Sequence, residues 1–188
     1  MSMPMLASHR RTMLSSVHGD ILEIGFGTGA NLPYYPRHVR RLVAVDFNRG
    51  MSSIAQKRIK AFQIKVEFHL MDALKLTFPD ASFDSVVTSW TLCSVKGIER
   101  VLSEIHRVLK PEGVFCFLEH GLSPDKTVQR FQQIFNGLNE IVSCSLTRDI
   151  PALVRNAGFE IKPLETFYIE KFLSTHGYMY QGIARKNR

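Results

Sequence analysis

The segment Asp20-Ile-Leu-Glu-Ile-Gly-Phe-Gly-Thr-Gly29 decides the fold class of this chain. A short apolar run that ends in glycine is typical of a buried parallel strand, and the glycines that follow allow the backbone to turn tightly. The run Leu42-Val-Ala-Val-Asp46 repeats this form and ends on an acidic residue. Two such strands joined by a short connection indicate an α/β domain with a parallel sheet.

The rest of the chain continues the alternation of strands and helices. Further strands are predicted at 66–70, 83–88, 114–119, 161–169 and 178–184, and helices at 29–35, 50–62, 97–109, 123–144 and 148–157. The predicted fold class is doubly wound α/β, with a mostly parallel seven-stranded sheet and helices on both faces. We expect a single domain over 1–188, with a cofactor-binding half at about 15–120 and a substrate-side half at about 121–188.

Two of the predicted helices carry apolar residues at helical spacing. In 97–109 they are Ile98, Val101, Leu102, Ile105 and Leu109, and in 123–144 they are Phe131, Ile134, Phe135, Leu138 and Ile141. We expect core packing for both stripes. For the second stripe, contact with a membrane surface is the alternative.

Composition narrows the partners and the compartment. The chain has 188 residues and a formal net charge of +7, but its basic residues are scattered, so a solvated surface is preferred and no nucleic-acid partner is predicted. Cys93, Cys116 and Cys144 lack the spacing of a disulfide framework or a metal site, which favours the reducing cytoplasm and predicts no metal. The sequence contains no apolar run of membrane-helix length. It leaves peripheral membrane contact and oligomeric state open.

The glycine loop and the acidic residue after the second strand indicate an adenosine-containing ligand. In an open parallel sheet, ligands bind beyond the carboxyl ends of the strands, where Gly25, Gly27 and Gly29 let them approach the main chain. Asp46 stands where a carboxylate accepts hydrogen bonds from ribose hydroxyls. With Ala30, however, the loop also fits the pattern of a nicotinamide dinucleotide site.

Two further carboxylates favour a cationic ligand. Glu23 would repel a pyrophosphate, but it suits the ammonium or sulfonium end of S-adenosylmethionine. Asp72 follows the third strand and can accept a hydrogen bond from an adenine amino group, while Met71 or Ala73 packs on the ring. These residues separate the methyl donor from a dinucleotide.

The ordered motifs resemble those of class I S-adenosylmethionine-dependent methyltransferases. They are Glu23-Ile-Gly-Phe-Gly-Thr-Gly29, Val45-Asp46, Met71-Asp-Ala73, Ser82-Phe-Asp84 and Arg107-Val-Leu-Lys-Pro-Glu-Gly113. The resemblance implies that the glycine loop contacts the methionine part of the cofactor, Asp46 the ribose and Asp72 the adenine, with 89–92 beside the sulfonium. The implied cofactor-binding residues are Glu23, Gly25, Phe26, Gly27, Gly29, Asn31, Asp46, Phe47, Met71, Asp72, Ala73, Ser89 and Trp90.

Three other segments resemble a smaller group within this family. Thr91-Leu-Cys-Ser-Val95, Phe117-Leu-Glu-His120 and Cys144-Ser-Leu-Thr-Arg148 look like the group that contains alkyl-thiol methyltransferases and bacterial phospholipid N-methyltransferases. Members of that group usually have more chain before the glycine loop. Here 24 residues precede Gly25, so we expect a short cover over the active site.

The expected reaction is methyl transfer to a small-molecule thiol, amine, phenol or lipid head group. S-Adenosylmethionine supplies an activated methyl group, so the protein has to align the reactants and exclude water. His120 is the candidate general base, and Tyr34 and Tyr35 are candidate walls of an acceptor pocket. Cys93 is expected to be a packing residue rather than a nucleophile. An NAD-dependent oxidoreductase and a non-catalytic S-adenosylmethionine-binding module are the alternatives.

Overall fold

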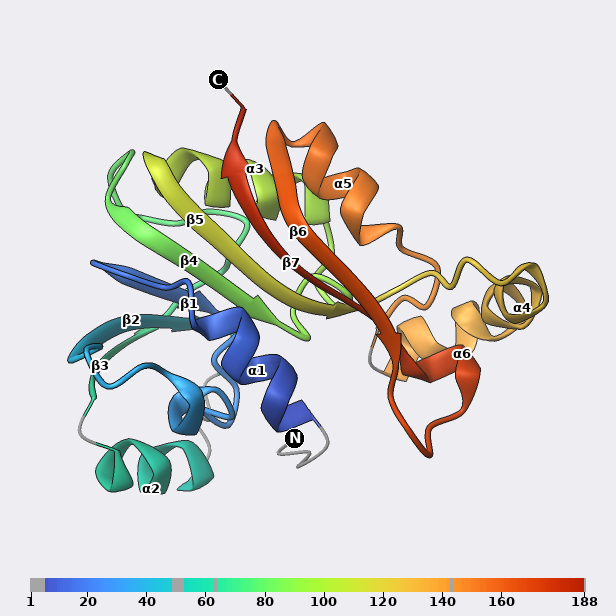
Figure 1. Ribbon diagram of the computed structural model, residues 1–188, viewed down its shortest axis with the longest axis horizontal. Helices are drawn as coiled ribbons and strands as arrows, with labels where there is room; N and C mark the ends of the chain where they lie inside the picture. Colours follow the sequence, from blue (N-terminus) through green and yellow to red (C-terminus); the bar gives the residue numbers. More distant parts are fainter. Residues whose placement is uncertain (1–5, 49–52, 63, 143, 188) are drawn as a thin grey trace.

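The computed structural model describes residues 6–48, 53–62, 64–142 and 144–187. Its centre is a seven-stranded sheet in the order β3-β2-β1-β4-β5-β7-β6 (Figure 1). Strands β1 to β5 pair in parallel, and β7 runs antiparallel to both β5 and β6. The strands are β1 (Ile21–Ile24), β2 (Arg41–Asp46), β3 (Lys65–Leu70), β4 (Phe83–Ser89), β5 (Leu109–His120), β6 (Phe159–Tyr168) and β7 (Tyr178–Lys186). The predicted fold class is confirmed.

Helices cover both faces of this sheet, as predicted. They are α1 (Ala7–Leu14), the 3-10 turn η2 (Leu32–Tyr34), α2 (Ser53–Ala61), α3 (Ile98–Val108), α4 (Lys126–Val142), α5 (Ile150–Asn156) and the short α6 (Ser174–Gly177). Helices α1 and α6 were not predicted. The predicted start of the second helix, at Gly50 and Met51, lies outside the described residues.

Each face of the sheet has its own hydrophobic core. On one face, α3 and α5 pack on strand residues such as Leu22, Val86 and Phe115. On the other, α1 and the segment around η2 pack on Ala44 and Cys116. Figure 1 shows α3 and α5 above the sheet and α1 and α2 below it. The two cores cover opposite faces of the parallel strands, so the carboxyl ends of β1, β2 and β4 are held firmly beside one another.

The stripe of α3 is buried, as predicted. Ile98, Val101, Leu102 and Ile105 are at most 5% exposed. The chain leaves this helix at Leu109 and enters β5 through an irregular stretch opposite Phe83 and Ser85. Lys110-Pro-Glu-Gly113 occupies this stretch.

The prediction of core packing is wrong for the stripe of α4. Phe131, Ile134 and Phe135 are 50%, 69% and 43% exposed, and the side chains of Leu138 and Ile141 lie outside the described part of the chain. Helix α4 and α6 project beyond the end of the sheet rather than covering a face (Figure 1). No helix among the described residues is long and apolar enough to cross a bilayer.

A buried polar side chain attaches α4 to the rest of the protein. The Gln132 amide group donates hydrogen bonds to the carbonyl oxygens of Gly121 and Thr175, both at 3.1 Å, and its oxygen accepts one from the Ser123 amide at 3.0 Å. Gln132 is fully buried. The helix therefore docks through a polar residue, whereas the described side chains of the apolar stripe, Phe131, Ile134 and Phe135, are exposed.

Candidate functional site

A cavity of about 690 Å³ lies at the carboxyl ends of β1, β2, β3 and β4. Its size is in the range of small-molecule and cofactor sites. Most of the residues predicted to bind the cofactor line it. They are Gly25, Gly27, Asp46, Phe47, Met71, Asp72, Ala73 and Trp90, joined by Thr91 from the segment expected beside the sulfonium and by residues that were not predicted, among them Leu74, Ser94, Val95 and Lys96.

A smaller hollow of about 180 Å³ meets this cavity at Gly25, Gly27 and Trp90. Its wall adds the predicted residues Glu23, Phe26, Asn31 and Ser89, together with Arg10, Thr28 and Ala30. Among the described residues that line the cavity and the smaller hollow, Gly29 is absent. It is buried against Leu32 and Phe26. The structure thus brings twelve of the thirteen predicted positions to one site and gives Gly29 a place in the packing below it.

The geometry of the first loop requires glycine. Gly25 has a φ of +77°, and a Cβ at this position would collide with Oγ1 of Thr91. Gly27 also has a positive φ, and its amide donates a 2.6 Å hydrogen bond to Oδ2 of Asp46. The carboxylate of Asp46, at the end of β2, is therefore held against the loop after β1. At this position it can accept hydrogen bonds from the ribose hydroxyls of a bound nucleoside.

A buried polar network lies beneath the smaller hollow. Asn31 donates to Oε1 of Glu23 at 3.0 Å, and the Tyr35 hydroxyl donates to Oε2 at 2.8 Å. Arg10, from α1, donates to the side-chain oxygen of Asn31 and to Oγ of Ser89. Glu23, Asn31 and Arg10 are all at most 5% exposed. The network fixes the carboxylate of Glu23 and the guanidinium of Arg10 at one end of the site.

Burial controls the protonation of Glu23. Loss of water raises its pKa to about 7, against the opposing effects of the hydrogen bonds from Tyr35 and Asn31 and the positive charge of Arg10. Burial also lowers the pKa of Arg10. A cationic ligand group beside Glu23 would stabilise the carboxylate, whereas an anionic group would not. Glu23 can bind an ammonium group and Arg10 can bind a carboxylate group. This end of the site can therefore hold the two charged groups of an amino acid.

Arg10 was missed by sequence reasoning. It belongs to a helix with only a weak amphipathic pattern, and the pair Arg10-Arg11 was interpreted as solvated surface. Arg11 does face outward, near the ring of Tyr34. No local motif distinguishes the two arginines, because burial depends on how α1 docks against β5 and β7.

The opposite end of the cavity has the form of a nucleoside site. Phe47 is 79% exposed and lines the cavity next to Asp46. Met71 and Ala73, which are half-buried, lie on either side of Asp72, whose Oδ1 accepts a hydrogen bond from the Leu74 amide at 2.9 Å. An apolar slot with a carboxylate at its edge can hold a purine and accept from its amino group.

Trp90 lies between the two ends of the site in an unfavourable backbone conformation. Its φ is +57°, which costs a non-glycine residue free energy and is found preferentially at functional sites. Its Nε1 is buried and has no hydrogen-bond partner among the described residues. The wholly buried Glu119 stabilises the loop that follows Trp90, accepting hydrogen bonds from the amides of Thr91 and Cys93. Burial raises the pKa of this carboxyl group.

The candidates for acceptor chemistry have different surroundings. Tyr35 supports Glu23 from beneath, so it belongs to the cofactor end. His120 is 4% exposed at the end of β5, and its Nδ1 lies 3.7 Å from Sγ of Cys144. Cys93 is buried, as expected for a packing residue. The role of His120 as general base stays a prediction.

These features define a class of protein. A parallel sheet with a glycine loop, a buried carboxylate at the amino-acid end and carboxylates after β2 and β3 forms a site for a cationic adenosyl ligand. S-Adenosylmethionine has this charge and shape. The dinucleotide alternative places a pyrophosphate beside Glu23, which electrostatic repulsion disfavours.

Comparison with known families agrees with this class. Residues 22–117 match the methyltransferase domain family, and the chain belongs to it. It is an S-adenosylmethionine-dependent methyltransferase. The family sets aside the oxidoreductase alternative.

Individual relatives differ in how much of the chain they match. A human thiol S-methyltransferase is 33% identical over 170 residues, which cover 82% of this chain and 68% of that protein. A phosphatidylethanolamine N-methyltransferase from Cereibacter sphaeroides is 36% identical over 104 residues, 54% of this chain and 51% of that protein. The chain therefore spans about half of the phospholipid enzyme.

Solved structures confirm the fold. An S-adenosylmethionine-dependent methyltransferase from Methanosarcina mazei aligns with a TM-score of 0.72 over 94% of this chain and 97% of its own, at 21% identity. The [4+2]-cyclase SpnF aligns with a TM-score of 0.74 at 19% identity, over 97% of this chain and 80% of its own. A neighbour described as a cyclase illustrates that the fold alone does not set the reaction.

Proposed function

We propose that the methyl acceptor of this enzyme is a small-molecule thiol. The observation that carries the proposal is that the match to a thiol S-methyltransferase covers 82% of the chain and includes residues 144–148, which pack against a loop that lines the cavity. Residues 144–148 pack against the loop 91–95, where Ser145 donates to the Cys93 carbonyl oxygen at 2.8 Å. Arg148 donates to the carbonyl oxygens of Leu92 and Val95.

The extent of the matches supports a thiol over a lipid head group. The thiol S-methyltransferase match covers 82% of the chain, so it must extend well beyond residues 22–117 into the half that contains 144–148. The phospholipid enzyme and a demethylmenaquinone methyltransferase from Symbiobacterium thermophilum each match 54% of the chain. The resemblance to an enzyme named for thiols therefore includes the half that contains 144–148.

The site provides what thiol methylation requires. In-line transfer from a sulfonium needs an acceptor held about 3 Å from the methyl group with water excluded, and a thiol must lose its proton to become a good nucleophile. The loop 91–95 lines the larger cavity through Thr91, Ser94 and Val95, and the segment 144–148 packs against this loop. The cytoplasm, which supplies reduced thiols, remains our proposed location, consistent with the predicted absence of a disulfide framework.

A panel of acceptors tests the proposal. The purified chain is incubated with S-adenosylmethionine and separate alkyl thiols, amines, quinols and phosphatidylethanolamine vesicles, and methylated products are identified by mass spectrometry. We expect S-methyl thioethers from the alkyl thiols. The variant Asp46→Ala, expected to bind cofactor weakly, is the control that product arises in this site. Methylation of an amine, a quinol or the lipid, with none of a thiol, overturns the proposal.

A further inference from the structure

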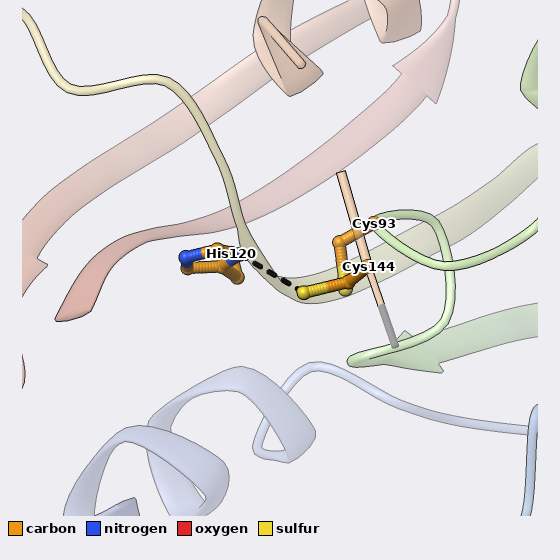
Figure 2. A group of neighbouring side chains, drawn as sticks. All are labelled: Cys93, His120 and Cys144. Atoms are coloured by element: carbon orange, nitrogen blue, oxygen red, sulfur yellow. Dashed lines mark hydrogen bonds between the residues drawn. The ribbon is translucent and has the colours of Figure 1, made fainter. Parts of the chain in front are cut away.

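Two thiols and an imidazole lie close together beside the loop that follows β4. Cys93 comes from that loop, His120 from the end of β5 and Cys144 from the segment after α4 (Figure 2). Their two sulfurs and a ring nitrogen all lie within 4.8 Å of one another. Figure 2 shows both sulfurs on the side of His120 that presents Nδ1, with Cys144 nearest.

We propose that Cys93, His120 and Cys144 form a binding site for one thiophilic divalent cation of the Zn²⁺ type. Tetrahedral zinc has Zn–S distances of about 2.3 Å and Zn–N distances of about 2.0–2.1 Å, which places its donor atoms about 3.5–3.8 Å apart. The distance from Nδ1 of His120 to Sγ of Cys144 is 3.7 Å. The remaining spacings are at most 4.8 Å and need a contraction of at most about 1.3 Å, which thiol rotamers can supply.

The three ligand residues are held in place by bonds that do not involve their side chains. The amide of Ser145 donates to the Cys93 carbonyl oxygen, which keeps the two cysteine segments adjacent. The amide of Cys93 also donates to Glu119, the neighbour of His120. Three segments distant in sequence are thus fixed around one point before any ion binds, which lowers the ordering cost of binding.

The hydrogen bonds of the described residues leave the ring of His120 poorly satisfied. Its Nε2 is buried without a partner, and the contact of its Nδ1 is with a sulfur, a weak hydrogen-bonding atom. Buried polar groups without partners are uncommon in folded proteins. A cation on Nδ1 would give the ring a strong partner and assign its proton to Nε2.

Binding of a cation at this cluster needs no redox chemistry. A thiophilic cation binds by displacing the two thiol protons to solvent, forming two metal–sulfur bonds without any oxidant.

Three protein ligands leave one coordination position open. Structural zinc sites usually have four protein ligands, whereas sites with three keep a place for water or substrate. On the proposed function, a thiol acceptor would be a suitable fourth ligand, since the cation would hold it as a thiolate beside the loop 91–95. This step alone rests on the thiol proposal, and the metal site itself does not.

Cobalt binding tests the site without reference to activity. The metal-free full chain is titrated with Co²⁺, and near-ultraviolet thiolate-to-cobalt absorption and visible tetrahedral bands are recorded, followed by displacement with one equivalent of Zn²⁺. We expect both bands to saturate at one Co²⁺ per chain in the parent protein. Cys144→Ser should lose most of the thiolate-to-cobalt intensity. His120→Ala should lose the tetrahedral bands.

Cys116→Ser is the matched control, because Cys116 is a buried cysteine on β5 outside the cluster. It should keep the full spectrum. Binding of S-adenosylhomocysteine by each variant checks that it is folded. Absence of thiolate absorption in the parent protein, its persistence in Cys144→Ser, or a Cys93–Cys144 disulfide in place of metal uptake overturns the proposal. Thiol methylation is assayed separately, so either proposal can fail alone.

Discussion

The two ends of the carboxyl edge of the sheet are built in different ways. On the cofactor side, the residues of the local motifs lie at the ends of parallel strands, since Gly25 follows β1, Asp46 ends β2 and Asp72 comes two residues after β3. On the acceptor side, the loop after β4, the end of β5 and the segment before α5 pack together by long-range contacts. Local motifs therefore specify the first region, and tertiary packing specifies the second.

The largest effect on the cofactor side is expected from removing Glu23. In Glu23→Ala, Asn31 and Tyr35 lose their acceptor, and the ligand ammonium loses its counter-charge. Truncating one member of a buried charged pair costs about 2–5 kcal/mol, so the affinity for S-adenosylhomocysteine should fall at least about 30-fold by titration calorimetry. Glu67→Ala, at an exposed carboxylate on β3, should bind normally. Parental affinity in Glu23→Ala would show that the amino-acid end lies elsewhere.

A smaller loss is expected from Asp46→Ala. The variant loses the charged acceptor for the ribose hydroxyls and the hydrogen bond from the Gly27 amide. Leaving such donors unmatched costs about 1–3 kcal/mol, or roughly 5- to 150-fold in affinity. The same calorimetric titration measures it, with Asp80→Ala as an exposed control. Equal affinities in the two variants would remove Asp46 from the site.

The pH dependence of binding tests the surroundings of Glu23 more finely. Its pKa of about 7 in the ligand-free protein means that the carboxyl group is mostly protonated below pH 7 and ionised above it. A cationic ligand prefers the ionised form, so binding releases a proton at low pH, and affinity should fall as pH decreases through 7. The limit is about tenfold per pH unit. Glu23→Gln should show a flat profile between about pH 5.5 and 7.5, and a sloping one would assign the titration to another group.

Sequence patterns predicted the seven strands and the cofactor side because both depend on residues close together in the chain. Apolar runs ending in Gly25 and Asp46 specify strand ends, and parallel strands bring those ends to one edge. Arg10 could not be identified in this way, since its role depends on where α1 docks. The cluster of Cys93, His120 and Cys144 was also invisible, because spacing rules for metal sites apply to ligands within one local motif.

The same limit explains why two similar stripes have opposite fates. Ile105 of α3 and Ile134 of α4 occupy equivalent positions in helical apolar patterns, yet Ile105 is fully buried and Ile134 is 69% exposed. Helix α3 has a sheet face beneath it, whereas α4 lies beyond the sheet and is attached through Gln132. Apolar periodicity shows which residues share one face of a helix, but it does not show which part of the protein packs against that face.

The smallest effect is therefore expected from Ile134→Ala. An exposed side chain contributes little to folding, so the free energy of unfolding in urea should change by less than about 0.5 kcal/mol. Ile105→Ala, the matched change in a buried stripe, should cost about 2–5 kcal/mol because it leaves a cavity. If Ile134→Ala were as destabilising as Ile105→Ala, the stripe of α4 would be packed in solution, and the contrast between the two helices would be wrong. Comparable, small losses in both would instead show that the α3 core relaxes around the missing atoms.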